Sequence, residues 1–248
     1  MLFRSNDENE TLERIENVGL ISSMNILYNC EFILATEYYL EAYGIGRNIS
    51  KLWNLKTKEL AKVFGENNNR HLSVLSCSAV NPSETLYATG SEDNNIKVWD
   101  LKTSELVYDF YANVNGISDL FFLDDKYLVS CSGPEIIIWN TDDGIKVLTY
   151  LISKNKKDYV IYDIDNYYKA TKNGLQLITY EYNNVVYPFE QFDLSFNRPD
   201  ILLSRLGSPW HDPVLIDLFN SAYLKRLKGN NWRQSLFSGD LQIGRAHV

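Results

Sequence analysis

Short apolar and β-branched runs separated by polar turns dominate the first 150 residues of the chain. Three of these runs end in tryptophan, at Trp53, Trp99 and Trp139, so the separations are 46 and 40 residues. A period of about 40–45 residues is typical of a four-stranded antiparallel unit that repeats along a chain. The pattern therefore predicts three such sheets, each anchored by one tryptophan.

The polar segments that follow the tryptophans repeat as well. Residues 53–60 read WNLKTKEL and residues 99–106 read WDLKTSEL, which match almost position for position. A looser third copy, WNTDDG, covers residues 139–144. Because Asn, Asp, Thr and Gly clusters favour turns, we expect each tryptophan strand to turn back into a further strand here.

The stretch from His71 to Trp99 is the most complete repeat, and it resembles a WD repeat, the unit of WD-repeat β-propellers. The resemblance rests on His71, Thr89, Asp93 and Trp99. It implies that the carboxylate accepts from the imidazole, the other ring nitrogen meets the hydroxyl, and the hydroxyl meets the indole N–H. A buried polar chain of this kind stabilises a fold only when every member is paired.

The same histidine, aspartate and hydroxyl residues would also suit a nucleophilic triad. Ordinary residues surround Thr89, and the sequence has no strained nucleophile turn there. The family resemblance accounts for all four positions, so we interpret His71 as a structural histidine and assign no catalytic residue.

The neighbouring repeats lack this set of residues. A gapless alignment on Trp53 places Tyr43 at the position of Thr89 and Arg47 at that of Asp93. The third repeat has Ser130 near the threonine position and no histidine. We expect these two blades to depend on apolar packing and to be less stable than the middle one.

Residues 158–187 alternate between strand-like runs and turns at 165–166, 173–174 and 183–184, which predicts a small β-rich module. They could also form a fourth blade-like sheet. The stretch 154–157, Lys-Asn-Lys-Lys, reads as a solvated basic turn rather than an anion contact. Helices are expected near Pro188 and after Asn197 or Asp200.

Residues 158–206 are similar to the segment that follows the WD repeats in bacterial proteins that also carry a caspase-like cysteine peptidase domain. The shared features are a turn that reads Asp-Asn-Tyr-Tyr at 165–168, a small residue and a glycine whose places are taken here by Thr171 and Asn173, and Arg-Pro-Asp at 198–200. Asn166 stands where the family has glycine, which a left-handed turn tolerates. The resemblance implies a regulatory or targeting role, and no catalytic residue matches within this chain.

Residues 212–228 carry the clearest helical pattern, with apolar residues at helical spacing. Asp212 suits the N-cap and Pro213 the first helical position. The helix either docks on the preceding module or connects to a further domain. His211 is expected to be an exposed loop residue.

Composition narrows the classes of function. The chain has 248 residues and a net charge of −8, so nucleic acid is a poor default partner. No apolar run or leader predicts membrane insertion or export, which favours a cytoplasmic location. Cys30, Cys77 and Cys131 have no metal-ligand spacing and are expected to be buried, reduced thiols.

The last six residues, 243–248, read IGRAHV and resemble one reading frame of a sequencing-library adapter. We interpret them as a scar outside the fold, which would make the chain a fragment. With three recognisable blades, an incomplete ring is expected, since closed propellers usually have about four to eight.

The sequence thus predicts a mostly β protein. WD-repeat blades cover 1–155, a β-rich module with short helices covers 156–210, a C-terminal helix or connector covers 211–242, and the scar covers 243–248. We expect a non-catalytic scaffold that binds proteins or peptides through the loops at 67–70 and 92–95, with Arg70 and Glu92 as rim candidates. No cofactor, metal, nucleic-acid or membrane partner is expected. The alternative is the regulatory part of a caspase-like peptidase whose catalytic domain is a missing part of the same polypeptide.

Overall fold

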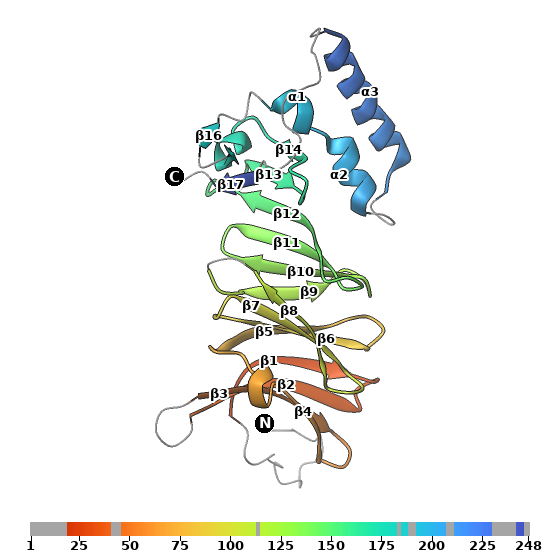
Figure 1. Cartoon of the computed structure of the whole chain (residues 1–248). Helices are drawn as coiled ribbons and strands as arrows, with labels where there is room; N and C mark the ends of the chain where they lie inside the picture. The colour runs from red at the N-terminus through yellow and green to blue at the C-terminus, as the bar shows by residue number, and fades with distance from the viewer. Residues whose placement is uncertain are drawn as a thin grey trace. The chain divides into compact units, whose positions relative to one another are not determined.

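The computed structural model of the chain describes residues 19–40, 46–112, 115–182, 185–187, 192–206, 211–229 and 242–245. The chain divides into two compact units, Met1–Gly133 and Pro134–Val248. Antiparallel strands build the described part of the first unit, and the second combines strands with helices (Figure 1). The mostly β prediction, with helices only near the C-terminus, is confirmed.

The first unit contains two four-stranded antiparallel sheets, ordered β1-β2-β3-β4 and β5-β6-β7-β8. A short 3-10 helix, η1, lies between them, and the antiparallel pair β9–β10 follows. The bounds are β1 Leu20–Leu27, β2 Phe32–Leu40, β3 Gly46–Asn54, β4 Leu60–Phe64, η1 Asn67–Asn69, β5 Leu75–Val80, β6 Leu86–Ser91, β7 Asn95–Asp100, β8 Leu106–Tyr111, β9 Asp119–Phe122 and β10 Tyr127–Ser132.

Each anchoring tryptophan lies at the same irregularity of its strand. The pairing with the following strand shifts register at Leu52/Trp53, at Val98/Trp99 and at Ile138/Trp139. A β-bulge of this kind increases the local twist and redirects a side chain. The repeated sequence pattern therefore corresponds to a repeated backbone feature.

The turn after each tryptophan is built in the same way each time. The side-chain oxygens of Asn54, Asp100 and Asn140 accept hydrogen bonds from the backbone N–H two residues later, at 2.8–2.9 Å. Four residues after each of these, the backbone has positive φ, at Lys58, Ser104 and Gly144. This local hydrogen bonding explains why the WNLKTKEL and WDLKTSEL segments agree so closely.

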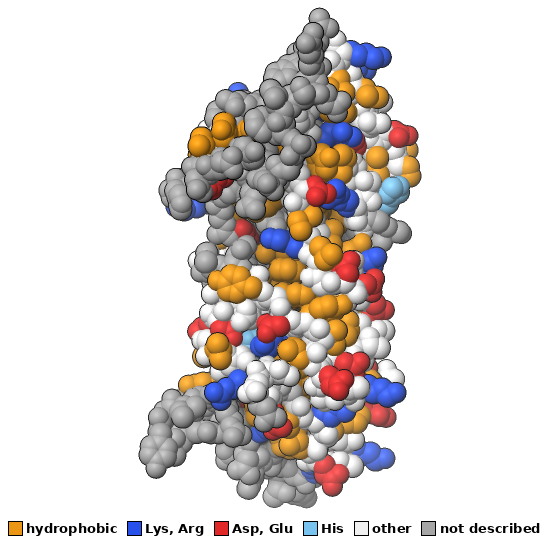
Figure 2. All heavy atoms as spheres, viewed as in Figure 1, with side chains coloured by type: hydrophobic (Ala, Val, Ile, Leu, Met, Phe, Trp, Pro, Cys, Tyr) orange, Lys and Arg blue, Asp and Glu red, His pale blue; other side chains and the backbone are white. Residues whose placement is uncertain are grey.

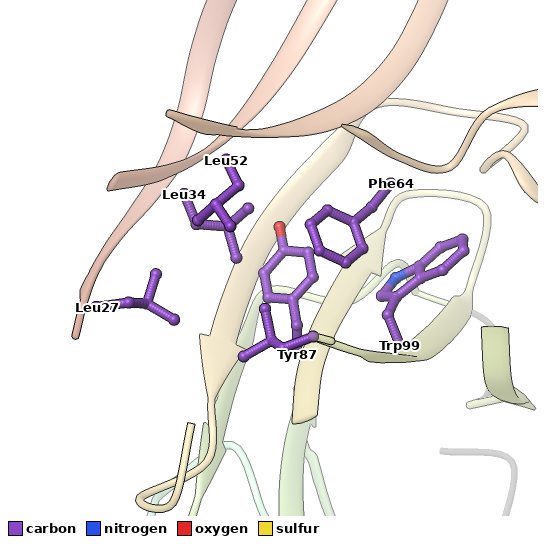
Figure 3. Packing of buried hydrophobic residues seen from close by; sticks show 7 residues of the cluster. Leu27, Leu34, Leu52, Phe64, Tyr87 and Trp99 are labelled. Atoms are coloured by element: carbon purple, nitrogen blue, oxygen red, sulfur yellow. The ribbon is translucent and has the colours of Figure 1, made fainter. Parts of the chain in front are cut away.

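The main core of the first unit lies between its two sheets (Figure 3). The Phe64 ring lies 5.3 Å from that of Tyr87 and 6.3 Å from that of Trp99, between ring centroids. The Tyr87 hydroxyl is buried and donates a hydrogen bond to Ser50 Oγ at 2.8 Å, so its burial carries no unpaired polar group. The buried members are Leu27, Leu34, Leu52, Phe64, Tyr87, Trp99 and Leu101.

Two polar contacts join these sheets at the ends of their strands. The Glu84 carboxylate accepts hydrogen bonds from the backbone N–H of Tyr28 at 2.8 and 3.0 Å. The Lys62 ammonium donates to the backbone carbonyls of Leu101 and Lys102. Charged groups that satisfy backbone atoms across an interface fix its register as well as contributing stability.

The strand register corrects the gapless alignment of the first repeat. Thr89 pairs with Lys97 in the second sheet, and Ala35 pairs with Lys51 in the first. Ala35, rather than Tyr43, therefore occupies the threonine position. The alignment failed because more residues separate β2 and β3 than separate β6 and β7. Tyr43 lies outside the described residues.

In the second unit, four consecutive strands pair antiparallel in the order β11 to β14. Another strand, β15, pairs with β16 on one side and β17 on the other. The bounds are β11 Glu135–Asn140, β12 Lys146–Ile152, β13 Tyr159–Tyr162, β14 Tyr168–Ala170, β15 Ile178–Tyr182, β16 Val185–Tyr187 and β17 Gln242–Arg245. The alternative of a fourth blade at 158–187 is wrong, because its strands belong to two different sheets.

A second core joins these strands to the helices that follow. Tyr168 and Tyr180 are fully buried, and the Tyr180 ring lies 4.9 Å from Phe192. The Tyr168 hydroxyl donates to Asp193 Oδ1 at 2.6 Å. The helices are η2 Gly174–Leu177, α1 Asp193–Phe196, α2 Pro199–Leu206 and α3 Pro213–Gly229. Asn166 has a φ of 67°, the left-handed turn expected where it replaces glycine.

Helix α3 forms as predicted and packs mainly on α2. Asp212 accepts hydrogen bonds from the backbone N–H groups of Val214 and Leu215 at its start. The Arg198 guanidinium lies 3.9 Å from the centre of the Tyr223 ring, and Arg226 pairs with Asp193 at 3.4 Å. Helix α2 begins at Pro199, and the Arg198 carbonyl accepts its first backbone hydrogen bonds.

The structure also bears on other expectations drawn from the sequence. Cys30 is exposed, in a turn where three successive residues have positive φ, so the prediction that it is buried is wrong. The helix expected near Pro188 falls on residues outside the described part of the chain. Residues 243–248 were interpreted from the sequence as a scar outside the fold. In the structure, Gln242–Arg245 forms β17 and pairs with β15. Among the described residues, no helix is long and apolar enough to span a membrane.

The turn between β13 and β14 contains a buried carboxylate. Asp163 accepts from the backbone N–H groups of Asp165 and Tyr167, and Arg205 of α2 lies 2.8 Å from its second oxygen. Burial raises the pKa of Asp163 to about 6, although the Arg205 charge and the Tyr167 N–H favour the ionised form. This carboxylate joins α2 to the strands that precede it.

The inter-sheet core predicts a large effect for Phe64→Ala. Removal of this buried ring should lower the free energy of unfolding by about 3–5 kcal/mol, because a cavity remains beside Tyr87 and Trp99. Leu60→Ala on the same strand, where the side chain is 44% exposed, is the control and should change stability by about 0.5 kcal/mol. Equal effects in urea denaturation would contradict this assignment of the core.

The Asp163 carboxyl predicts a pH dependence with a defined sign. Its folded-state pKa of about 6 exceeds the ordinary value near 4, so the folded chain binds more protons between these values. Its contribution to the free energy of unfolding therefore falls as pH rises through this window, by about 2–3 kcal/mol at most. Asp163→Asn should remove this component in denaturation measured at each pH. Asp165→Asn, at the exposed partner of Arg205, should retain it.

Candidate functional site

The four residues singled out in the middle repeat meet in the second sheet. His71 Nδ1 lies 3.2 Å from both carboxylate oxygens of Asp93, and His71 Nε2 lies 2.9 Å from Thr89 Oγ1. The Trp99 indole N–H donates to the same hydroxyl oxygen at 3.1 Å. His71, Thr89 and Trp99 are each at most 3% exposed. The geometry is a continuous chain from carboxylate to indole.

The carboxylate end of this chain is strongly held in its ionised form. Burial alone would raise the pKa of Asp93, but the hydrogen bond and attraction from His71 and the backbone N–H groups of Asn95 and Leu72 lower it. A neutral imidazole with its proton on Nδ1 donates to this carboxylate and accepts from the threonine hydroxyl. Every polar member is then paired.

This geometry does not suit nucleophilic catalysis. The Thr89 oxygen already accepts from the indole and the residue is 2% exposed, so a substrate carbonyl has no approach to it. Burial also raises the pKa of the Cys77 thiol to about 11, which keeps it protonated. No cluster of three metal-ligating side chains occurs within the described ranges. The network is best read as a structural clamp on the loops at its carboxylate end.

Those loops present the rim residues predicted from the sequence. Arg70 immediately precedes His71, and Glu92 immediately precedes Asp93, so the His71–Asp93 pair brings both to one end of the sheet. Both side chains are exposed. Within the part of the chain that the structure describes, neither forms an ion pair with a neighbour.

The sequence reasoning did not single out Leu72, the residue that follows His71. Its backbone N–H donates to the Asp93 carboxylate at 2.7 Å, while its side chain is 82% exposed. The backbone of Leu72 is therefore held in place while its apolar side chain is in solvent. The only signal for this residue in the sequence is that an apolar residue follows the structural histidine, before the alternation of apolar and polar residues in the next strand begins.

The adjoining loop is fixed in the same region. Asn94 has a φ of 69°, and its side-chain oxygen accepts from the Gly116 N–H at 2.6 Å. Gly116 also has positive φ, and a side chain there would meet Glu92 Cα at 3.3 Å. The loops at 92–95 and 115–117 therefore pack against each other, which keeps Glu92 in a defined position.

The other tryptophans occupy different environments. Trp139 is buried and Trp53 is half-buried, with the Lys51 ammonium 5.7 Å from the centre of its ring. Ser130, expected near the threonine position of the third repeat, is 1% exposed. Arg47 lies on β3 opposite Tyr39.

The middle repeat matches a known protein family. Residues 62–100 match the family model for the WD domain, G-beta repeat. The match begins within β4 of the first sheet and ends with β7 of the second, so the repeat unit and the sheet are offset by one strand. No curated protein matches the sequence significantly.

Two solved structures resemble the chain, one described as "Structure of U3-55K" and the other as "Crystal structure of RRP9 WD40 repeats". Each has a TM-score of 0.47 and 14% sequence identity over 63% of this chain. The match covers 53% of the first solved chain and 52% of the second, about half of their length.

The clamp predicts a stability cost for His71→Ala. The variant should lose roughly 1–3 kcal/mol of unfolding free energy, because Asp93 and Thr89 lose a buried partner. Arg70→Ala, one residue away and exposed, is the control and should be near neutral. A melting temperature for His71→Ala that equals that of the control would refute the structural role.

Proposed function

We propose that this chain is a non-catalytic protein-interaction module whose second sheet presents a binding rim formed by Arg70, Leu72 and Glu92. The observation that carries the proposal is the exposed Leu72 side chain on a backbone fixed by the Asp93 carboxylate. A preorganised anchor loses little conformational entropy on binding. WD repeats typically mediate protein–protein interaction, which agrees with the family match at 62–100.

The two flanking charges suit recognition of a polypeptide. Arg70 and Glu92 differ in sign, so a partner must offer complementary groups on either side of an apolar side chain. On the face shown in Figure 2, charged side chains of both signs are interspersed with hydrophobic ones. Specificity would then come from the local arrangement at the rim.

The charge of the chain also bears on the class of partner. Residues 1–133 contain 11 Lys and Arg against 19 Asp and Glu, whereas residues 134–248 contain 13 of each. The net charge of −8 therefore belongs to the unit that carries the rim. This field repels phosphate backbones and attracts neutral or basic protein segments.

The alternative, a regulatory portion of a caspase-like peptidase, rests on the sequence resemblance at 158–206. The contacts described for that segment are packing and ion-pair contacts within its own unit. The rim therefore supports the interaction module as the primary proposal.

Substitution at the rim tests this function. Leu72→Asp should reduce the capture of bound proteins by affinity-tagged chain at least about 10-fold, because an anchor residue contributes about 2 kcal/mol or more. The double variant Arg70→Glu, Glu92→Lys should change the set of captured proteins. Val107→Asp, at another exposed apolar position on β8, is the matched control.

Circular dichroism melting should show that all of these variants fold as the wild type does. If Leu72→Asp and the charge-reversed variant capture the same proteins in the same yield as the control, the rim assignment is wrong.

A further inference from the structure

Strands β8 and β12 occupy equivalent positions in the second and third repeats. Each follows a tryptophan strand, and their registers relative to Trp99 and Trp139 are the same. Counting along both strands from these tryptophans gives three matched positions: Asp109 with Thr149, Phe110 with Tyr150, and Tyr111 with Leu151. The two strands can therefore be compared residue by residue.

The outer edge of β12 is covered by a further strand of the same chain. β13 pairs antiparallel with the last four residues of β12 (Figure 1). The Ser153 backbone N–H donates to the Asp158 carbonyl at 2.9 Å. Because bonded and non-bonded pairs alternate in an antiparallel ladder, Thr149 and Leu151 are the residues whose backbone groups bond β13. Leu151 is 5% exposed and packs in one core with Val160 of the added strand.

The outer edge of β8 has no such cover among the residues that the structure describes, because the order of its sheet ends at β8. The Ala112 N–H donates to the Asn94 carbonyl at 2.9 Å. The same alternation then directs the backbone groups of Asp109 and Tyr111 away from β7. Tyr111, the equivalent of the buried Leu151, is 65% exposed. β8 therefore presents outward the backbone groups that β12 uses to bind β13.

The first sheet does not offer the same edge. Its outer strand β4 ends at Phe64, and Gly65, at the position of Tyr111, has a φ of 82°. Lys62 on that strand donates to backbone carbonyls of the second sheet. Of these two outer strands, β8 is the one that combines two outward-facing residues with an exposed aromatic side chain.

The side chains along the edge of β8 define what an added strand must carry. Lys97 of β7 pairs with Asp109 at 2.5 Å, yet the Asp109 side chain is 46% exposed, so its carboxylate can accept from a second cation. Tyr111 lies on the same side of β8, since alternate residues of a strand share a face. A basic residue opposite Asp109 and an apolar residue opposite Tyr111 would complement both side chains.

We propose that the outer edge of β8, over residues 109–112, binds an extended segment of a partner protein as an added antiparallel strand. The segment carries a basic residue opposite Asp109 and, two positions earlier, an apolar residue opposite Tyr111. Main-chain hydrogen bonds supply affinity in this mode of recognition, and alternate side chains supply specificity. The surface involves none of the rim residues, and Val107 lies outside it.

A labelled peptide derived from β13 tests the proposal by fluorescence anisotropy with the full chain. The peptide has the sequence of residues 157–164 with Tyr162→Lys, which places lysine opposite Asp109 and keeps Val160 opposite Tyr111. It should bind the wild-type chain. The same peptide with Tyr162→Glu should bind at least about 5-fold more weakly, because two carboxylates then face each other across the strands.

Methylation of single peptide nitrogens distinguishes strand addition from apolar contact alone. In the added strand, the N–H at Val160 would donate to β8, whereas the N–H at Ile161 would point away from it. N-methylation at Val160 should therefore abolish binding. N-methylation at Ile161 should leave the dissociation constant within about 3-fold of that of the parent peptide.

Variants of the chain locate the site. Tyr111→Ala removes the exposed ring and keeps the outward N–H, whereas Tyr111→Pro removes both and leaves the hydrogen bonds to β7 in place. The proline variant should bind the lysine peptide more weakly than the alanine variant does. Asp109→Asn should reduce the preference for the lysine peptide over the glutamate peptide. Leu72→Asp, at the rim, should bind as the wild type does, which separates this surface from the proposed function.

The proposal is wrong if the wild type does not bind the lysine peptide at concentrations up to about 1 mM. It is also wrong if N-methylation at Val160 and at Ile161 has the same effect, or if Asp109→Asn leaves the charge preference unchanged. Where Tyr111→Pro melts at a lower temperature than the wild type, the N-methylated peptides decide in its place.

Discussion

The contact of Phe64 with Tyr87 and Trp99 is the interaction on which the first unit depends. Neither sheet can bury its apolar face alone, because a four-stranded sheet needs a partner layer to exclude water. Phe64 comes from the last strand of the first sheet, while Tyr87 and Trp99 come from the second. The apolar packing thus joins two successive repeats rather than completing one.

The family match at 62–100 follows the same logic. It begins in β4 and ends with β7. The matched unit therefore includes Lys62 and Phe64 of the first sheet, which contact Leu101 and Trp99 of the second. A repeat defined in sequence therefore contains the link between two sheets.

The buried network and the exposed rim are two consequences of one arrangement. His71, Thr89 and Trp99 pair their polar groups inside the sheet, and Asp93 completes the chain where the strands end. The same carboxylate binds the Leu72 backbone N–H, so the clamp that stabilises the fold also fixes the residue that we propose for binding. Stability and presentation of the rim are thereby coupled.

Sequence by itself determined the features that depend on local backbone chemistry. The three tryptophan strands, the turns after them and the Asp212-capped helix follow from side chains that act on nearby backbone or on a repeated pattern. The residues of the polar network were identified through the resemblance to a WD repeat. Tertiary structure alone decided the rest. The register of β2 and β3 places Ala35 at the position where a gapless alignment placed Tyr43. The sequence does not reveal this difference, because the length of the turn between two strands leaves their apolar pattern unchanged. The pairing of β13 and β14 with β12, the exposure of Cys30 and the outward direction of Leu72 likewise depend on which surfaces meet, and contacts between distant residues leave no periodic signal in a single sequence.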